Sequence, residues 1–342
     1  MKTQFLFIGC LLLLVVSTKS YAIGGTDGAI TWQLEDSVLT ISGEGEMPRY
    51  DSPLMESNAP WTYYASSIKQ IIVGDSVTSI GKYAFYSLEK YYENLVLVHL
   101  GRAVNKIGAG AFAYCFNLSS IILPNDLTSI GYNAFMGCGI TSLVFPSSMI
   151  TIEGAAFRRC SYLTSITIPI GVTTVREETF DYCSKLSSVI IPKSVTHIQK
   201  FAFANCGNLN QVEVDWEFPT RVRIDNAAFD QTDLTDVTLV VPYGMKEAYE
   251  HEDVWKDFGK IVERTTAIRP IDASTVFISV ENGNLQVISP ETESINVYSV
   301  SGQLLFQSMK AAGEAAFPIN TIQDKVLIVK GSSGWVRKVI QQ

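Results

Sequence analysis

The feature that most constrains this chain is a phenylalanine, usually preceded by alanine, that returns at a near-constant interval. It occurs seven times, and most neighbours are 22 or 23 residues apart: Phe85, Phe112, Phe135, Phe157, Phe180, Phe203 and Phe229. Thr179 replaces the alanine before Phe180. A period of this size is typical of solenoids built from single coils. One coil cannot bury its own apolar face, so consecutive coils must stack and share a continuous core.

Each unit also contains a short segment in which apolar residues alternate with others, as in SIIL (120–123) and SITI (165–168). Alternation with a period of two predicts a β-strand with one set of side chains inward and the other outward. Proline follows four of these segments and predicts that ladder pairing ends there. We therefore expect a parallel sheet of eight stacked strands. The predicted strands are 70–73, 97–100, 120–123, 142–145, 165–168, 188–191, 211–214 and 236–239.

The repeat unit, read here as KIGAGAFAYCFNLSSIILP and TSIGYNAFMGC, resembles the BspA-type leucine-rich repeats of Bacteroides-like bacteria and Treponema. The resemblance covers about residues 65–242 and implies a right-handed leucine-rich repeat solenoid, an α/β-solenoid dominated by β-structure. Residues 23–64 are expected to form an N-terminal β cap, and residues 243–263 resemble the helical segment that ends many such arrays. Caps of this kind cover the sheet edges and core that the terminal coils would otherwise expose.

Residues 1–22 have the pattern of a signal peptide. A basic start precedes the apolar run from Phe5 to Val16, and small residues at 20 and 22 mark a cleavage site. The apolar run is too short to cross a bilayer, and no later segment is a candidate transmembrane span. Cys10 leaves a lipoprotein anchor open as an alternative. We therefore expect an exported protein at the cell surface, outside the outer membrane, or secreted.

The C-terminal part is patterned differently from the repeats. Residues 264–272 read as a linker, and residues 273–342 as a small antiparallel β-sandwich. The segment INVYSVSGQLLF and the closing RKVIQQ resemble the C-terminal sorting domains of the type IX secretion pathway of Bacteroidetes. That resemblance implies passage through the outer membrane. Asp324 or Lys325 replaces the glycine usual before the penultimate strand, so an accessory β-domain without a sorting role is the alternative.

Composition excludes several classes of partner. The formal net charge is −8 at pH 7, and lysine and arginine form no run. The chain therefore lacks the basic stripe that nucleic acids require and is a poor partner for an anionic membrane surface. The three histidines, His99, His197 and His251, show no metal-ligand spacing. We expect no metal and no cofactor.

Cysteines stand three residues after five of the repeat phenylalanines: Cys115, Cys138, Cys160, Cys183 and Cys206. This spacing predicts one column along the stack. Leu88 and Thr232 hold the position in the end repeats, which favours a small, weakly polar side chain there. We interpret the column as buried reduced thiols packed as small hydrophobes. Occasional disulfides, or a metal or redox function, are the alternatives.

Alignment of the predicted strands defines two outward columns, which we take as the candidate ligand-contact face. The first contains Ile72, His99, Ile122, Val144, Thr167, Ile190, Glu213 and Thr238. The second includes the hydroxyl residues Ser120, Ser142, Ser165 and Ser188. The sheet of a solenoid is its usual binding surface, and an apolar strip of this length is large for an idle one. The alternative is that these residues are simply good strand formers.

Nothing in the sequence points to catalysis. Motifs for a nucleophile or a phosphate loop are missing, and His99 and Glu213 lie five strand spacings apart, about 24 Å. We expect no enzyme. One hypothesis is an adhesion module whose repeat sheet binds an extracellular protein or glycoprotein, as the family resemblance implies. The other is a non-enzymatic envelope scaffold or glycan-binding component. Replacing Ile122 and Ile190 with aspartate should abolish binding only under the first hypothesis.

Overall fold

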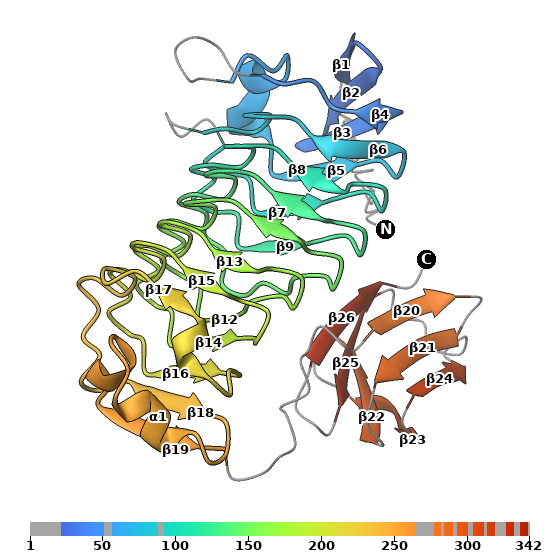
Figure 1. Ribbon diagram of the computed structural model, residues 1–342. Coiled ribbons are helices and arrows are strands. Elements are labelled where there is room, and N and C mark those ends of the chain that lie inside the picture. Colours follow the sequence, from blue (N-terminus) through green and yellow to red (C-terminus); the bar gives the residue numbers. More distant parts are fainter. Residues whose placement is uncertain are drawn as a thin grey trace, which may run out of the picture.

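The computed structural model describes residues 22–50, 57–87 and 92–264, together with seven strands between residues 277 and 340. Nearly all of the expected signal peptide, Cys10, and the expected linker after Arg264 lie outside the described residues. Within the described part, the repeats form a stack of similar coils, seen edge-on in Figure 1.

All but one of the coils contribute one strand to a first sheet and, after a turn, a further short strand to a second sheet. The strands of the first sheet are β5 (Gln70–Val73), β7 (Leu97–His99), β9 (Ser120–Ile122), β12 (Ser165–Thr167), β14 (Ser188–Ile191), β16 (Gln211–Val214) and β18 (Thr238–Val241). Those of the second are β6 (Val77–Ile80), β8 (Lys106–Ile107), β10 (Ser129–Ile130), β11 (Thr151–Ile152), β13 (Thr174–Val175), β15 (His197–Ile198) and β17 (Arg223–Ile224). Paired strands within each set run parallel. The repeats form a β-solenoid of about eight turns with little helix.

The expected α component is therefore confined to the ends of the array. Between β5 and β18, the described residues contain one helical segment, the 3-10 helix η2 (Pro219–Arg221). A coil of about 23 residues that already holds two strands and two turns has too few residues left for a helix of ordinary length. The described repeat residues are consequently mostly short β-strands and turns.

The N-terminal cap is an antiparallel meander that continues the first sheet. Its strands are β1 (Ile23–Asp27), β2 (Ile30–Glu35) and β3 (Val38–Gly43), and β3 pairs in parallel with β5. The short β4 (Gly45–Glu46) pairs with β6 and begins the second sheet. Before the 3-10 helix η1 (Thr62–Ser67), Trp61 is fully buried. Its ring stacks on Phe85 at 5.6 Å, so the indole closes the core of the first coil.

The C-terminal cap is less helical than the sequence suggested. Its α-helix α1 (Lys246–Glu250) has one turn and is followed by the 3-10 helix η3 (Trp255–Asp257). The remaining segment forms β19 (Lys260–Glu263), which pairs in parallel with β18. A strand satisfies the exposed backbone groups of the last sheet edge, which a helix cannot do. Phe258 covers the core by contacting the ring of Phe229 edge-on at 5.6 Å.

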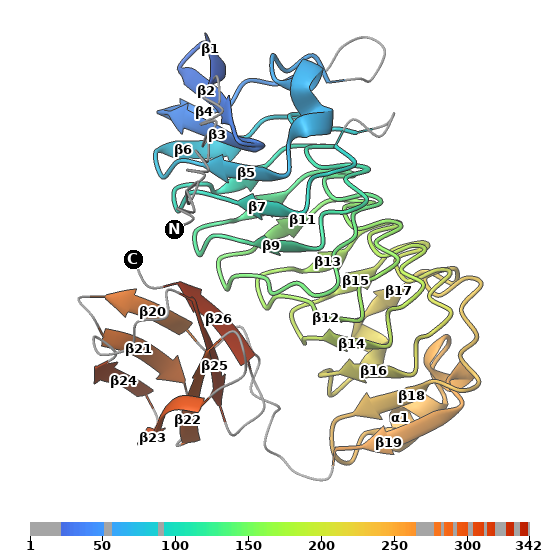
Figure 2. The same cartoon turned by 180° about the vertical axis from the view of Figure 1, so that it is seen from behind.

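One predicted strand is missing. Residues 142–145 form no strand, and the first sheet divides there into a part ending at β9 and a part beginning at β12 (Figure 2). The side chains keep their alternation, since Val144 is exposed and Phe145 is buried. This repeat is one residue shorter than its neighbours: Cys138 precedes its proline by eight positions, whereas Cys160 precedes its own by nine. The deletion lies directly before the segment whose pairing is lost.

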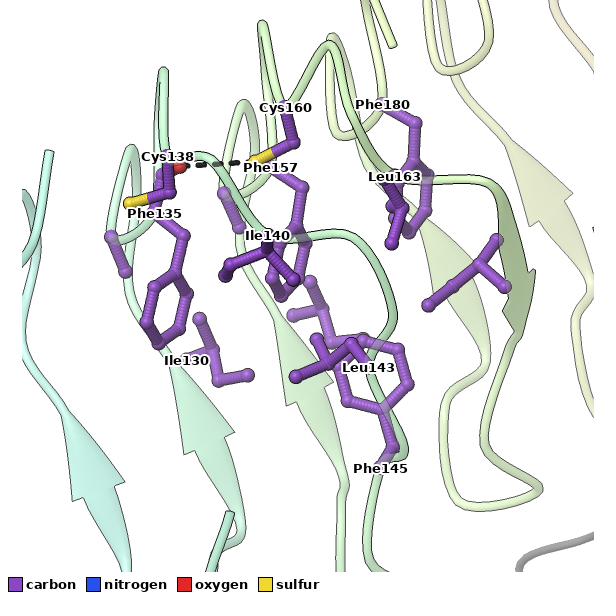
Figure 3. Packing of buried hydrophobic residues seen from close by; sticks show 14 of the residues in the cluster. Ile130, Phe135, Cys138, Ile140, Leu143, Phe145, Phe157, Cys160, Leu163 and Phe180 are labelled. Atoms are coloured by element: carbon purple, nitrogen blue, oxygen red, sulfur yellow. Dashed lines mark hydrogen bonds between the residues drawn. The ribbon is translucent and has the colours of Figure 1, made fainter. Parts of the chain in front are cut away.

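The core is organised around the repeat phenylalanines. From Phe85 to Phe229 each ring stacks on the next, with centroids 5.2 to 5.7 Å apart and planes within 19° of parallel. Figure 3 shows Phe135, Phe157 and Phe180 in this column beside the inward side chains of the strands. Backbone hydrogen bonds reinforce this column, because the N–H of Phe157 donates to the carbonyl oxygen of Thr179 in the next coil at 2.9 Å. The repeat phenylalanines from Phe85 to Phe203 make the equivalent bond.

The five described cysteines are free and buried, which confirms the interpretation as packed thiols. Each thiol donates a hydrogen bond to the carbonyl oxygen of the repeat phenylalanine one coil earlier, at 3.1 to 3.4 Å. Burial raises the pKa of Cys160 and of Cys206 to about 12. The thiols are therefore protonated in the folded protein and poor nucleophiles.

Beyond residue 276 the described strands form two antiparallel sheets. One contains β20 (Phe277–Glu281), β21 (Asn284–Ser289) and β24 (Gly313–Pro318). The other contains β22 (Glu293–Ser299), β23 (Leu304–Lys310), β25 (Val326–Gly331) and β26 (Val336–Ile340). Buried residues of both sheets, among them Leu285 and Val329, form a single hydrophobic cluster. The antiparallel character expected of this segment is confirmed, and its sorting role stays a prediction.

Candidate functional site

The strand register places most candidate residues in two rows on the outward face of the first sheet. Before the gap at 142–145, directly opposed residues of the first row are Ile72, His99 and Ile122. After the gap they are Thr167, Ile190 and Glu213. In the second row, Ser120 lies opposite Leu97, and Ser165 lies opposite Ser188. Within each part of the sheet these residues therefore lie in common rows, as the alternation in the sequence predicted, and their contact with a ligand stays a prediction.

Exposure is greatest in the middle of this face. The side chains of Ile122 and Val144 are 46% and 50% exposed, which is high for large apolar residues. His99, Ser120, Ser142 and Ser165 are also exposed, whereas Ile72, Thr167, Ile190 and Ser188 are half-buried. The accessible part of the face is thus centred on β9 and the irregular segment that follows it.

Thr238 does not lie in the row to which the sequence assigned it. The register pairs Thr238 with Gln211, so it belongs to the serine row, and Val240 lies opposite Glu213 instead. The strand is Thr238–Val241, two residues later than predicted. Pro242 follows this strand directly, as proline follows four of the segments predicted as strands, and that signal in the sequence would have given the correct register.

Glu213 is not available to a ligand. It is buried, and its Oε1 atom lies 2.8 Å from Nε of Arg264. The Arg264 guanidinium also pairs with Asp215 at 2.9 Å and donates to the carbonyl oxygen of Val214 at 2.7 Å. Arg264 directly follows β19, so the cap folds a cation over the end of the face. Burying a carboxylate is tolerable only with such a partner.

The serine row differs from the hydroxyl row beside it. Thr164 and Ser187 donate their hydroxyls to backbone carbonyls of the preceding coil, at 3.2 and 2.9 Å. Within the part of the chain that the structure describes, the hydroxyls of the serine row make no such bond: Ser120, Ser142, Ser165 and Ser188. These hydroxyls are free to bond a ligand.

The described residues contain no group of three or more side chains that could hold a metal ion. His99 and Glu213 stay on distant strands, β7 and β16, and Glu213 is occupied by Arg264. No helix among residues 22–50, 57–87 and 92–264 is long and apolar enough to cross a bilayer.

Sequence reasoning missed two residues of this face. Val240 takes the place assigned to Thr238, and Arg264 neutralises Glu213. Pro242 could have revealed Val240. No pattern in the sequence indicated that Arg264 pairs with Glu213, since Arg264 lies outside the repeats, at the start of the predicted linker 264–272.

Comparisons with known proteins agree with the repeat. Residues 59–138 and 128–247 match the BspA type Leucine rich repeat region, in six copies. A leucine-rich repeat protein of Bacteroides ovatus is 16% identical, covering 72% of this chain and 75% of that chain, with a TM-score of 0.41. The T. pallidum leucine-rich repeat protein is 23% identical, covering 54% and 90%, with a TM-score of 0.39. A leucine rich cell surface protein of Faecalibacterium prausnitzii is 18% identical, covering 72% and 96%, with a TM-score of 0.28. No curated protein matches.

The matched ranges span the coils from β5 to β18 and include more than half of the 342 residues. They contain the phenylalanine column, the cysteine column and both rows of the outward face. Repeats of this kind are typically non-catalytic binding modules. The chain belongs to the BspA-type leucine-rich repeat family.

Proposed function

We propose that this protein is an exported, surface-displayed adhesion module that binds an extracellular protein through the outward face of its first sheet. Three observations support the proposal: the signal-like residues 1–22, membership of a family of binding repeats, and an accessible face with little charge. The face carries the argument, because it distinguishes a binding module from a solenoid with an entirely solvated surface.

The central observation is the exposure of Ile122 and Val144 beside unbonded serine hydroxyls. Between β5 and β18 the two rows contain one carboxylate, Glu213, and Arg264 neutralises it. Covering such a face removes apolar area from water without stripping water from unpaired charges. Binding at this face therefore costs little desolvation free energy.

This chemistry favours a protein partner over a sugar. Branched aliphatic side chains gain free energy chiefly by contacting other apolar side chains, which a polypeptide supplies. The serine hydroxyls can then satisfy polar groups of the partner that would otherwise be buried without a hydrogen bond. We therefore expect a partner with exposed apolar residues and backbone groups.

An array of immobilised extracellular matrix proteins, glycoproteins and glycans, probed with the chain from residue 23 onward, tests the function. The decisive variant is Ile122→Asp with Val144→Asp, because these are the exposed large apolar residues of the first row, whereas Ile190 is half-buried. The matched control is Ile150→Asp with Ile170→Asp, which are 61% and 54% exposed outside both rows. Their thermal unfolding should resemble that of the wild type.

We expect the array to identify a protein partner, the Ile122 and Val144 variant to lose its binding, and the control to retain it. A partner that binds the Ile122 and Val144 variant unchanged overturns the role of this face. Binding to glycans alone, or to nothing on the array, favours the envelope scaffold or glycan-binding component instead.

The proposal of surface display is based on the signal-like residues 1–22 and the sorting-like residues 273–342. We propose that residues 273–342 direct export across the outer membrane, as their resemblance to sorting domains implies. Deleting them should leave the repeats folded but retain the protein inside the outer membrane, as measured by protease accessibility on intact cells. Unchanged surface exposure of the truncated protein would make this segment an accessory domain.

A further inference from the structure

The edge of the stack opposite the proline turns carries exposed aromatic side chains that the proposed function does not use. This edge consists of the turns that hold the repeat phenylalanines, and it forms the left side of the stack in Figure 1. Tyr162 and Tyr182, from consecutive coils, are 52% and 45% exposed there. Half-exposed tyrosine rings present both an apolar face and a polar hydroxyl to a ligand.

A cation lies over each of these rings, and the two pairs are crossed between coils. Cζ of Arg159, in the coil of Tyr162, lies 5.7 Å from the ring centroid of Tyr182. Nζ of Lys185, in the coil of Tyr182, lies 4.4 Å from the ring centroid of Tyr162. Each pair therefore bridges the two coils, and cation–π attraction holds both cations in place on the surface. We call these four residues the turn cluster.

The turn cluster is compact. Arg159 and Tyr162 are three residues apart, as are Tyr182 and Lys185, so each couple spans at most about 11 Å of backbone. The coils are directly bonded at this point, since the N–H of Arg159 donates to the carbonyl oxygen of Asp181 at 2.7 Å. The cluster is too small for a stable protein interface, which takes about 800 Å² from each partner. It suits one or two units of a small ligand or polymer.

The charges of the turn cluster are not balanced within the described structure. The neighbouring Arg158 pairs with Glu178 at 2.9 Å and with the buried Asp181 at 3.0 Å. Arg159 and Lys185 are exposed and have no salt bridge to any described residue. In a chain with a net charge of −8, two adjacent unpaired cations on aromatic rings are a local exception. They favour an anionic ligand.

We propose that the turn cluster binds carboxylate-bearing sugar units of an anionic polysaccharide. The carbon–hydrogen face of a sugar ring covers the apolar face of a tyrosine, while the sugar carboxylate accepts charge-assisted hydrogen bonds from Arg159 and Lys185. Neighbouring units of the polymer extend along the same edge. This site is separate from the sheet face and does not depend on the protein partner proposed above.

Affinity electrophoresis of the chain from residue 23 onward, in gels containing polygalacturonate, tests the proposal. We expect the wild type to be retarded, and retardation to fall as salt is added. Arg159→Gln with Lys185→Gln should weaken apparent binding about tenfold or more. The control, Lys106→Gln with Lys193→Gln, makes the same change in net charge away from these turns and should leave retardation unchanged.

Two further comparisons separate sugar recognition from simple charge attraction. Tyr162→Leu with Tyr182→Leu keeps both cations and should still weaken binding severalfold, and methyl-esterified polygalacturonate should not retard the wild type. The proposal is overturned if polygalacturonate does not retard the wild type, if the control weakens binding equally, or if polyglutamate retards the protein as strongly. Retardation that persists in Ile122→Asp with Val144→Asp is expected, and its loss would place the sugar on the sheet face instead.

Discussion

The thiol of Cys160 donates a hydrogen bond to the carbonyl oxygen of Phe135, 3.1 Å away in the preceding coil. The same oxygen accepts the backbone N–H of Cys138 at 3.0 Å. In the last repeat Thr232 makes the equivalent bond, its hydroxyl donating to Phe203 at 2.9 Å. From Cys115 to Thr232, the column position therefore holds a compact side chain that donates a hydrogen bond between coils.

Replacing Cys160 with threonine should accordingly preserve stability better than replacing it with valine. Valine has the shape of threonine but no hydroxyl to donate a hydrogen bond. Because the carbonyl oxygen of Phe135 keeps its bond from Cys138, we expect a difference of about 1 kcal/mol in the free energy of unfolding. Urea denaturation of the two variants measures it. If the valine variant is as stable as the threonine variant, the thiol bond contributes nothing and packing alone explains the column.

The thiol column should also make the protein sensitive to alkali. Burial raises the pKa of Cys160 and of Cys206 from 9.0 to about 12, so the unfolded chain releases these protons first. The folded state binds more protons between pH 9 and 12, and stability therefore falls as pH rises through that window and is unaffected below it. Each thiol contributes up to about 1.4 kcal/mol per pH unit.

The measurement is the free energy of unfolding at pH 8, 9 and 10, below the range in which buried tyrosines add a large effect. The double variant Cys160→Thr with Cys206→Thr should lose less stability between pH 9 and 10 than the wild type does. Parallel pH dependences in the two proteins would mean that these thiols ionise as readily in the folded state as in the unfolded state.

The repeat made the core predictable from the sequence. Seven phenylalanines at a near-constant interval require seven equivalent positions along a stack, and the rings do form one column from Phe85 to Phe229. The cysteines follow at a fixed offset, so their column and burial follow as well. Alternation within each strand likewise separated inward residues such as Ile121 from outward ones such as Ile122.

Departures from the period were not predictable in the same way. The one-residue deletion before 142–145 is visible in the sequence, but the alternation there looks normal, so a strand was expected. The neutralisation of Glu213 depends on Arg264, which is far along the chain and outside the repeats. A contact of that kind has no periodic signature and required the structure.

The pairing of Arg264 with Glu213 should contribute to stability. Arg264→Gln leaves a buried carboxylate without its cation, and we expect a loss of about 2–4 kcal/mol. Arg223→Gln serves as the control, since its ion pair with Asp225 is largely exposed and should cost less than about 1 kcal/mol. Adding Glu213→Gln to Arg264→Gln should recover part of the loss. Failure of this second substitution to restore any stability would show that the arginine acts by packing and not by its charge.

Replacing Gly110 with alanine should destabilise its repeat turn. Its φ of +62° lies in the left-handed region, and a Cβ atom there would approach the ring of Tyr83 to 2.7 Å. Ala155 adopts a similar φ of 52° two coils later, so Gly110→Ala should still fold but lose about 1–2 kcal/mol in the free energy of unfolding.

Gly207→Ala is the matched control, because a Cβ atom there meets nothing within 4 Å and its φ is not left-handed. It should be neutral or stabilising by about 0.5 kcal/mol, since alanine restricts the unfolded chain. Thermal or urea unfolding of the two variants decides the matter: equal stabilities would mean that the turn before Phe112 relaxes enough to accept a side chain.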